Sequence, residues 1–256
     1  MAGGRPAARR LRDPRRVHPV LLLVSERRVS GLRLLLLLGL WAGLALLVLG
    51  VTILAGRLFF SAWAVAHRAD LGAILVAEAY LTLLAALLLA FGGAAGLRDR
   101  LRFRFTSLVD VVVALLVWLF ALLIGGLVTA ALSPLIGEPQ SNTVTLLNQS
   151  FDPLFVAVIV PTVCLLAPFC EELLFRGALF GWLAGHLPVA VSVVVVATVF
   201  AGAHLLPQLF PVLFVFGLAT TIVRARTDST LNSFAMHATQ NTFAVAATYA
   251  LLSRGG

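Results

Sequence analysis

Long apolar runs recur along this chain and restrict it to a small set of folds. A run of about 18 or more mainly apolar residues is typical of a transmembrane helix. We expect seven spans, at about 31–55, 71–96, 109–132, 157–184, 189–206, 208–223 and 231–252. A helix satisfies its own backbone hydrogen bonds in a bilayer, and the strict alternation that a membrane β-barrel needs is absent. The sequence therefore predicts an all-α, polytopic transmembrane helical bundle of about seven spans, placed as a multi-pass protein in the cell membrane.

The arginines indicate how these spans are oriented. All 19 basic residues are arginine, and the formal net charge is +8. Eight arginines lie in residues 1–30 and four in 98–104, whereas 133–152 has none. Cytoplasmic loops carry an excess of basic residues, so we predict that the N-terminus lies in the cytoplasm and the C-terminus outside. Arg57 and Arg68 are exceptions to this bias.

The basic residues lie in tails and short loops between apolar spans. We therefore interpret the charge as a topology signal and expect the lipid bilayer as a partner, with no nucleic acid. The abundance of Ala, Gly, Val and Leu, with arginine in place of lysine, favours a bacterial origin with a GC-rich genome.

Two local expectations stay open. Segment 135–152 is polar and is predicted to form a short external element. If the break at Pro207 does not reach the surface, the fifth and sixth spans are one broken helix.

The late spans carry a set of ionisable and amide side chains that the early spans lack. A charged side chain in a bilayer costs roughly 2.5–3.5 kcal/mol on insertion scales, so each such residue needs a reason. The set consists of Glu171, Glu172, Arg176, His204, His237 and Asn241. The early spans offer only Glu78, Asp110 at a helix start, and Arg33 at an edge.

Helix geometry shows which of these side chains share a face. Glu172 and Arg176 are four residues apart and can pair, whereas Glu171 is turned by about 100° from Glu172. His237 and Asn241 are also four apart. If its span starts at 231, His237 lies only ~9 Å along it, while Glu171 lies ~20 Å above the cytoplasmic end of its own span. The two can meet only if the last helix begins a turn or more earlier or is tilted.

A glutamate and a histidine together can activate water as a general base, and a second histidine with an asparagine can donate hydrogen bonds to a developing oxyanion. That set is sufficient to hydrolyse an amide. The residues also include zinc-ligand types, but the HExxH pattern is missing. Cys164 and Cys170 lie in an apolar stretch with no nucleophile motif around them, and we interpret them as small apolar fillers.

Three short motifs carry a family resemblance. "EELLFR" is followed by "FAGAH" and then by "HATQN". They resemble the EExxxR, FxxxH and HxxxN motifs of the CPBP family, which comprises CAAX prenyl proteases of the second type and bacteriocin-processing or immunity proteins, also called Abi proteins. The resemblance covers about residues 165–245, in the same order. It divides the chain into a basic cytoplasmic tail (1–30), N-terminal transmembrane helices with an external loop (31–156), and a CPBP/Abi-like catalytic core (157–256).

The resemblance implies a glutamic intramembrane endopeptidase that acts on a membrane-associated peptide or protein. By position in the motifs, Glu171 and His204 would activate water, while His237 and Asn241 would form the oxyanion hole. Glu172 and Arg176 would support the site. No cofactor is implied, although a divalent metal is left open, because such proteins have also been classed as metalloproteases.

Two other functions fit the same residues. A non-catalytic membrane scaffold or bacteriocin-immunity protein could use the pocket for binding alone. A proton-coupled transporter could use the Glu, His and Arg side chains as a relay. The transporter hypothesis predicts internal symmetry, and the early and late spans differ sharply in polarity.

Overall fold

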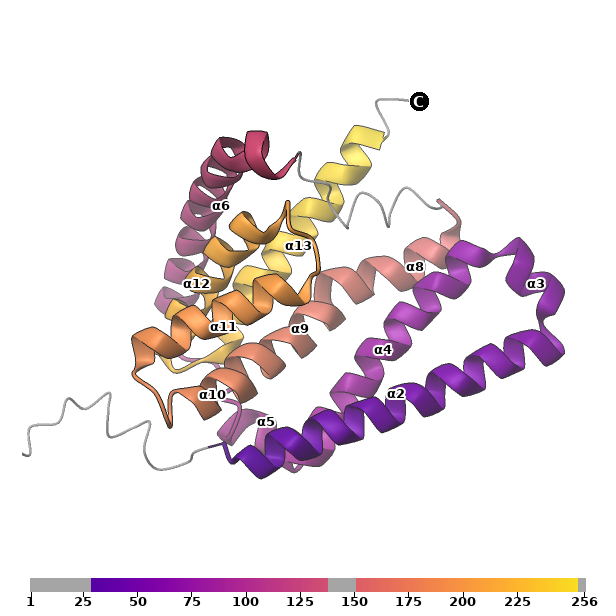
Figure 1. Cartoon of the computed structure of the whole chain (residues 1–256), viewed down its shortest axis with the longest axis horizontal. Coiled ribbons are helices and arrows are strands. Elements are labelled where there is room, and N and C mark those ends of the chain that lie inside the picture. The colour runs from indigo at the N-terminus through magenta and orange to yellow at the C-terminus, as the bar shows by residue number, and fades with distance from the viewer. Residues whose placement is uncertain (1–28, 138–150, 253–256) are drawn as a thin grey trace, which may run out of the picture.

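The computed structural model describes residues 29–137 and 151–252, and within these ranges all regular structure is helical (Figure 1). The α-helices are α2 (Gly31–Phe59), α3 (Ser61–Ala66), α4 (Arg68–Phe91), α5 (Gly93–Asp99), α6 (Leu108–Ile136), α8 (Pro153–Pro161), α9 (Ala167–Glu172), α10 (Phe180–Leu183), α11 (Val189–Ala203), α12 (Phe210–Thr227) and α13 (Thr230–Leu252). Two π-helical segments, Thr162–Leu166 and Leu173–Leu179, join α8, α9 and α10 into one continuous rod. The predicted all-α membrane bundle is thereby confirmed.

Within the described ranges, five helices are long and apolar enough to cross a membrane: α2, α4, α6, the rod Pro153–Leu183, and α12. The remaining two predicted spans correspond to α11 and α13. With 15 residues, α11 extends about 22 Å and is shorter than the ~30 Å hydrocarbon core of a bilayer. α13 has 23 residues but carries more polar side chains. The predicted spans without a membrane-spanning apolar helix are therefore a short helix, α11, and a more polar one, α13.

The second predicted span, 71–96, ends earlier than expected. α4 stops at Phe91 because Gly92 and Gly93 both adopt positive φ angles, 88° and 72°, which break the helix and which glycine tolerates. The short α5 follows in a new direction. The predicted external segment 135–152 begins inside α6, and its residues 138–150 lie outside the described ranges, as do residues 1–28 of the predicted tail.

The break at Pro207 separates two distinct helices. α11 ends at Ala203 and α12 begins at Phe210, and the two pack against each other as an antiparallel pair. A Cβ atom placed on Gly217 would lie only 3.1 Å from the Cα atom of Ala197, so the glycine permits this close approach. The alternative of one broken helix is therefore wrong.

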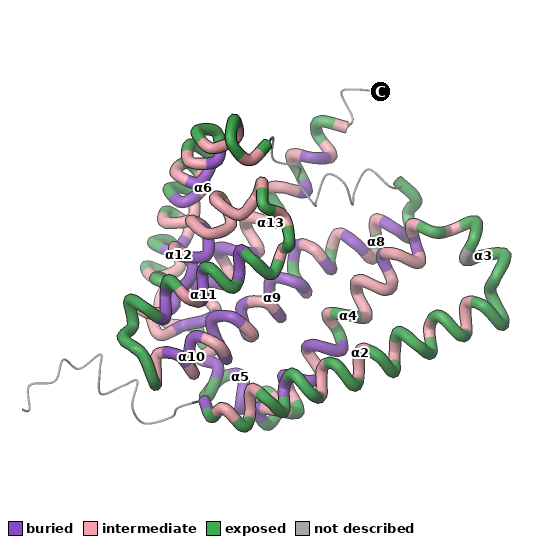
Figure 2. The backbone as a smooth tube through the Cα atoms, viewed as in Figure 1, coloured by how far each residue is buried: buried purple, intermediate pink, exposed green. Residues whose placement is uncertain are grey.

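The rod Pro153–Leu183 lies at the centre of the fold. α4 packs against one side of it, while α11 and α13 pack against another (Figure 1). α12 lies between α11 and α6, and α6 also contacts α13. α2 pairs with α4 on the outside of the bundle and is mostly exposed or half-buried (Figure 2). Leu37 is its one buried residue. Its remaining apolar surface therefore suits contact with lipid.

The segment between α5 and α6 is bonded to the turn between α12 and α13. The backbone N–H of Thr230 donates to the Arg102 carbonyl at 2.9 Å, and the Thr230 hydroxyl donates to the Leu101 carbonyl at 2.5 Å. Asp228, in the turn, pairs with Arg104 at 2.6 Å and with Arg224 at 2.9 Å. These bonds fix where α13 starts.

Candidate active site

One cavity of about 330 Å³ is lined by Glu171, His204, His237 and Asn241 together. Glu171 comes from α9, His204 follows the last residue of α11, and the other two lie one turn apart on α13. The structure thus brings together all four residues that the sequence singled out for chemistry. The rest of the cavity wall is mainly apolar, as in many ligand sites.

Glu171 is held from two sides. Its Oε1 accepts a hydrogen bond from the Tyr80 hydroxyl at 2.6 Å. Its Oε2 lies 3.8 Å from Nε2 of His237. The Glu171 side chain keeps 16% of its surface exposed, whereas that of Glu172 keeps none. Of the adjacent glutamates, Glu171 therefore presents its carboxylate to the cavity and Glu172 is sealed inside the protein.

Glu172 and Arg176 form a fully buried ion pair, with 2.8 Å between Oε1 of Glu172 and Nη1 of Arg176. The other guanidinium donors contact Thr220 at 2.5 Å, Thr221 at 3.3 Å and the Gly217 carbonyl at 3.4 Å, all on α12. Further hydrogen bonds to the guanidinium offset part of the cost of burying a charge pair. Arg176 therefore ties the central rod to α12 directly behind the cavity.

The same Glu172 carboxylate orients His237. Oε1 of Glu172 lies 2.9 Å from Nδ1 of His237. A carboxylate that already accepts from Arg176 can only accept from a ring nitrogen, so Nδ1 of His237 carries the proton. Nε2 is then turned toward Glu171 and the cavity. The sequence analysis assigned Glu172 a supporting part without identifying this contact.

His204 is oriented in a comparable way by its own helix. Its Nδ1 lies 2.8 Å from the carbonyl oxygen of Phe200, which can only accept a hydrogen bond, so Nδ1 carries the proton. The Phe200 ring lies 4.9 Å from the His204 ring and 5.6 Å from the His237 ring, and the Arg176 guanidinium sits 4.2 Å from its centroid. The phenylalanine of "FAGAH" thus separates the two histidines and packs on the buried arginine.

Asn241 supplies a hydrogen-bond donor that the backbone of the central rod lacks. In the π-helical segment, the N–H of Ala167 bonds to the carbonyl of Thr162, five residues earlier. The same spacing would pair the Val163 carbonyl with residue 168, which is a proline and has no N–H. The side-chain amide of Asn241 donates to that carbonyl at 2.9 Å instead. One N–H of the amide is therefore engaged, and one remains.

The register between α13 and the rod explains how His237 reaches Glu171. α13 starts at Thr230, only one residue before the predicted start and not a turn earlier, and Thr230 is buried among neighbouring segments. Thr230 is bonded to Leu101, and Leu101 packs on Gly177, where a Cβ atom would lie 2.9 Å from that of Leu101. Gly177 lies six residues after Glu171 in the rod, and His237 lies seven residues after Thr230 in α13, so the two spacings are similar. The two side chains therefore lie at matching depth.

Two residues in the cavity wall were missed by the sequence analysis. Tyr80 is one of only two tyrosines in the chain, but nothing in its neighbourhood in the sequence indicates a contact 91 residues away. Gln240 also lines the cavity, and its side-chain oxygen accepts from the Trp118 indole N–H at 2.8 Å. This bond leaves the NH₂ of Gln240 free to donate into the cavity.

Glu78, two residues before Tyr80, lies apart from the site. It accepts a hydrogen bond from Thr52 at 2.8 Å and lines a separate small space between α2 and α4. Cys164 and Cys170 are buried free thiols. Among the residues that the structure describes, no group of three or more His, Cys, Asp or Glu side chains is arranged as a metal site.

A family model described as "Type II CAAX prenyl endopeptidase Rce1-like" matches residues 153–243. This range contains all the residues of the three motifs and both π-helical segments. No curated protein matches the chain, and no solved structure matches it. The match confirms the family resemblance that the motifs indicated. Residues 153–243 carry an Rce1-like domain, which is a domain of a protease family, within an all-helical membrane protein.

Proposed function

We propose that this protein is an intramembrane glutamic-type endopeptidase of the cell membrane that hydrolyses a peptide bond of a membrane-associated substrate. The observation that carries the proposal is the meeting of three distant motifs at one cavity. Glu171 and His204 line it from different helices, and each is held by a neighbour that leaves one functional atom turned inward. Such residues would be costly in a bilayer without a function.

Glu171 and His204 are the proposed general-base pair. With Nδ1 of His204 protonated, its Nε2 carries the lone pair that can accept a hydrogen bond from water. The Glu171 carboxylate accepts from Tyr80 through Oε1, while Oε2 lies 3.8 Å from Nε2 of His237, beyond hydrogen-bond distance, and can accept from the same water. Water held between the two groups loses a proton as its oxygen attacks the substrate carbonyl carbon.

His237 and Asn241 are the proposed electrophilic side of the site. Because Glu172 accepts from Nδ1, His237 can donate from Nε2 only in its imidazolium form. Asn241 keeps one N–H beyond the one that bonds the Val163 carbonyl. Both groups can donate to the oxygen that becomes negative in the tetrahedral intermediate, where fixed donors contribute most. The proton taken from water then passes to the leaving amine.

The Glu171→Gln variant tests the base. Glutamine keeps the size and can still accept from Tyr80, but it cannot take a proton. We expect turnover to fall by roughly 10²–10⁴ fold, with the melting temperature unchanged. Substrates can be found by trapping, since a Glu171→Ala protein should retain uncleaved membrane clients that the wild type releases. Turnover of a trapped client by purified wild-type and Glu171→Gln protein then gives the measurement.

The same assay separates the alternatives. Activity that survives exhaustive chelation supports direct activation of water, whereas activity lost with chelator and restored by a divalent ion would make these side chains metal ligands. Full biological activity of the Glu171→Gln protein would favour the non-catalytic scaffold or immunity function.

The Asn241→Ala variant tests the oxyanion side. Removal of one such donor typically costs about 10²–10³ fold in turnover, with little effect on substrate binding. The variant also leaves the Val163 carbonyl without its side-chain donor, so the melting temperature should fall as well. Unchanged turnover at full substrate saturation would contradict the assignment.

A further inference from the structure

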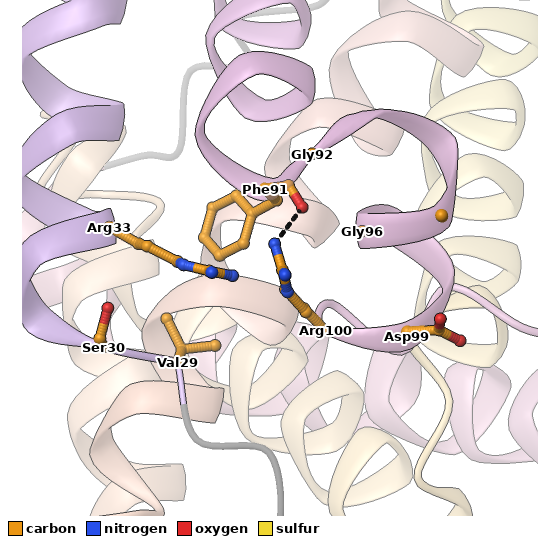
Figure 3. Close-up of a pocket in the computed structure, with 9 residues that line it drawn as sticks. Val29, Ser30, Arg33, Phe91, Gly92, Gly96, Asp99 and Arg100 are labelled. Carbon is orange, nitrogen blue, oxygen red and sulfur yellow. Dashed lines mark hydrogen bonds between the residues drawn. The ribbon is translucent and has the colours of Figure 1, made fainter.

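A second cavity, of about 520 Å³, lies where α2 begins and α4 turns into α5, and it shares no lining residue with the cavity of Glu171 (Figure 3). Its wall includes Val29, Arg33, Phe91, Asp99 and Arg100. None of these residues belongs to the three motifs. This is the end of the molecule at which the loop arginines gather, and therefore the end that the charge bias assigns to the cytoplasm.

Two guanidinium groups approach each other across this cavity. Figure 3 shows Arg33 on α2 pointing toward Arg100, which follows α5. Arg100 is held in place because its Nη1 donates to the carbonyl oxygen of Phe91 at 2.7 Å. Within the described ranges, neither arginine forms an ion pair with a carboxylate. Asp99 also lines the cavity, but its carboxylate points away from both guanidinium groups (Figure 3).

Two like charges that face each other at the mouth of a cavity repel unless an anion lies between them. A guanidinium presents a planar fork of donors that fits phosphate oxygens, and two of them can hold one phosphate from two sides. The phenyl ring of Phe91 and the side chain of Val29 add apolar surface beside the charges. A ligand that fits both features has a phosphate next to apolar groups.

We propose that this cavity binds the phosphate headgroup of an anionic phospholipid of the cytoplasmic leaflet. We favour a lipid over a soluble anion because of where the cavity lies relative to the membrane. α2 is the most lipid-exposed span, since only 6% of its apolar window is buried in the protein, and its first turn forms one wall of the cavity. Basic pockets between transmembrane helices on the cytoplasmic side are suited to lipid headgroups.

The bound lipid would join α2 to the α4–α5 corner. The structure holds α2 mainly through its contact with α4, so a phosphate shared by Arg33 and Arg100 would add a link at the end of that pair. Binding to the folded protein alone raises its apparent stability. The site therefore predicts that an anionic phospholipid stabilises the protein independently of any substrate.

The test uses the full-length purified protein in detergent. Its melting temperature and the lipid adducts seen by native mass spectrometry are followed while phosphatidylglycerol or phosphatidylcholine is added. We expect phosphatidylglycerol to raise the melting temperature and to form a discrete adduct. The Arg33→Gln variant should weaken that binding about fivefold, because one basic side chain near an anionic surface contributes about that factor. The Arg33 side chain forms no hydrogen bond or ion pair with another described residue, and its backbone N–H bond to the Ser30 carbonyl is kept by glutamine, so this variant should fold normally.

Arg98→Gln is the matched control. Arg98 lies on α5 at the same end of the molecule, is exposed, and does not line the cavity. It should bind phosphatidylglycerol like the wild type. Equal weakening by Arg33→Gln and Arg98→Gln would show general attraction to basic charge and overturn the site. Inorganic phosphate at matched ionic strength gives the third arm, and stabilisation by phosphate equal to that by phosphatidylglycerol would replace the lipid with a soluble anion. No response to either would also overturn the proposal.

Discussion

At the scale of single residues, the hydrogen bond from Tyr80 positions the proposed base, Glu171. Its hydroxyl fixes one oxygen of Glu171, and a hydrogen bond to a charged group contributes about 1.5–3 kcal/mol. We expect Tyr80→Phe to lower kcat by about tenfold or more while KM changes little, because the substrate pocket keeps its shape. Steady-state kinetics on a trapped client measures both constants.

Tyr249→Phe is the control for this change. Tyr249 is the other tyrosine of the chain, on α13, and its hydroxyl has no hydrogen-bond partner among the described residues. It should leave kcat unaltered. If Tyr80→Phe instead raised KM and spared kcat, Tyr80 would contact substrate and would not position the base.

Arg176 is expected to matter for folding before it matters for chemistry. Arg176→Ala would strand the buried Glu172 carboxylate and remove the donors that bind α12, and breaking such a pair typically costs about 3–5 kcal/mol. We predict low abundance and a lowered melting temperature. Arg176→Lys keeps the charge but not the planar set of donors, so it should recover only part of the stability. An Arg176→Ala protein that accumulates and melts like wild type, yet is inactive, would show a direct catalytic part.

At the scale of elements, the contact between Gly177 and Leu101 sets the depth of α13. A methyl group on Gly177 would meet Leu101, which is fully buried, so the loop that bonds Thr230 would have to move. Overpacking of this kind typically costs about 1–3 kcal/mol. Gly177→Ala should therefore lower the melting temperature, and it should also lower turnover because the shift displaces His237.

Gly126→Ala is the matched change for this prediction. Gly126 lies inside α6, and a Cβ atom there would meet nothing within 4 Å. Alanine favours a helix over glycine, so this variant should be neutral or slightly stabilised. Equal loss of stability in both variants would mean that the Leu101 contact is not what fixes the register.

At the scale of the whole molecule, the arginine bias predicts which end of the bundle faces the cytoplasm. Ser61 and Arg98 are both exposed and lie at opposite ends of the α2–α4 pair. A cysteine at position 61 should react with a membrane-impermeant maleimide in intact cells, whereas one at position 98 should react only after permeabilisation. The native Cys164 and Cys170 are buried and should give little background. The reverse pattern would invert the topology and place the Arg33 cavity at the outer leaflet.

The sequence by itself determined the helical membrane fold and selected the candidate residues of the site. Polar groups are costly in a bilayer, so apolar runs identify the spans and ionisable residues stand out within them. That is why Glu171, His204 and His237 could be selected without a structure. The spacing of four between Glu172 and Arg176 likewise predicted an ion pair, because it follows from the geometry of one helix.

Only the tertiary structure decided how those residues are held. The bond from Tyr80 to Glu171 joins residues on two helices 91 positions apart, and no local pattern encodes it. The depth of His237 depends on the loop that is bonded to Thr230. Asn241 donates a hydrogen bond to the Val163 carbonyl, which has no backbone donor because of the π-helical turn and Pro168. Periodicity fixes the face of a helix that a side chain occupies, whereas its depth and partner follow from how the helices pack.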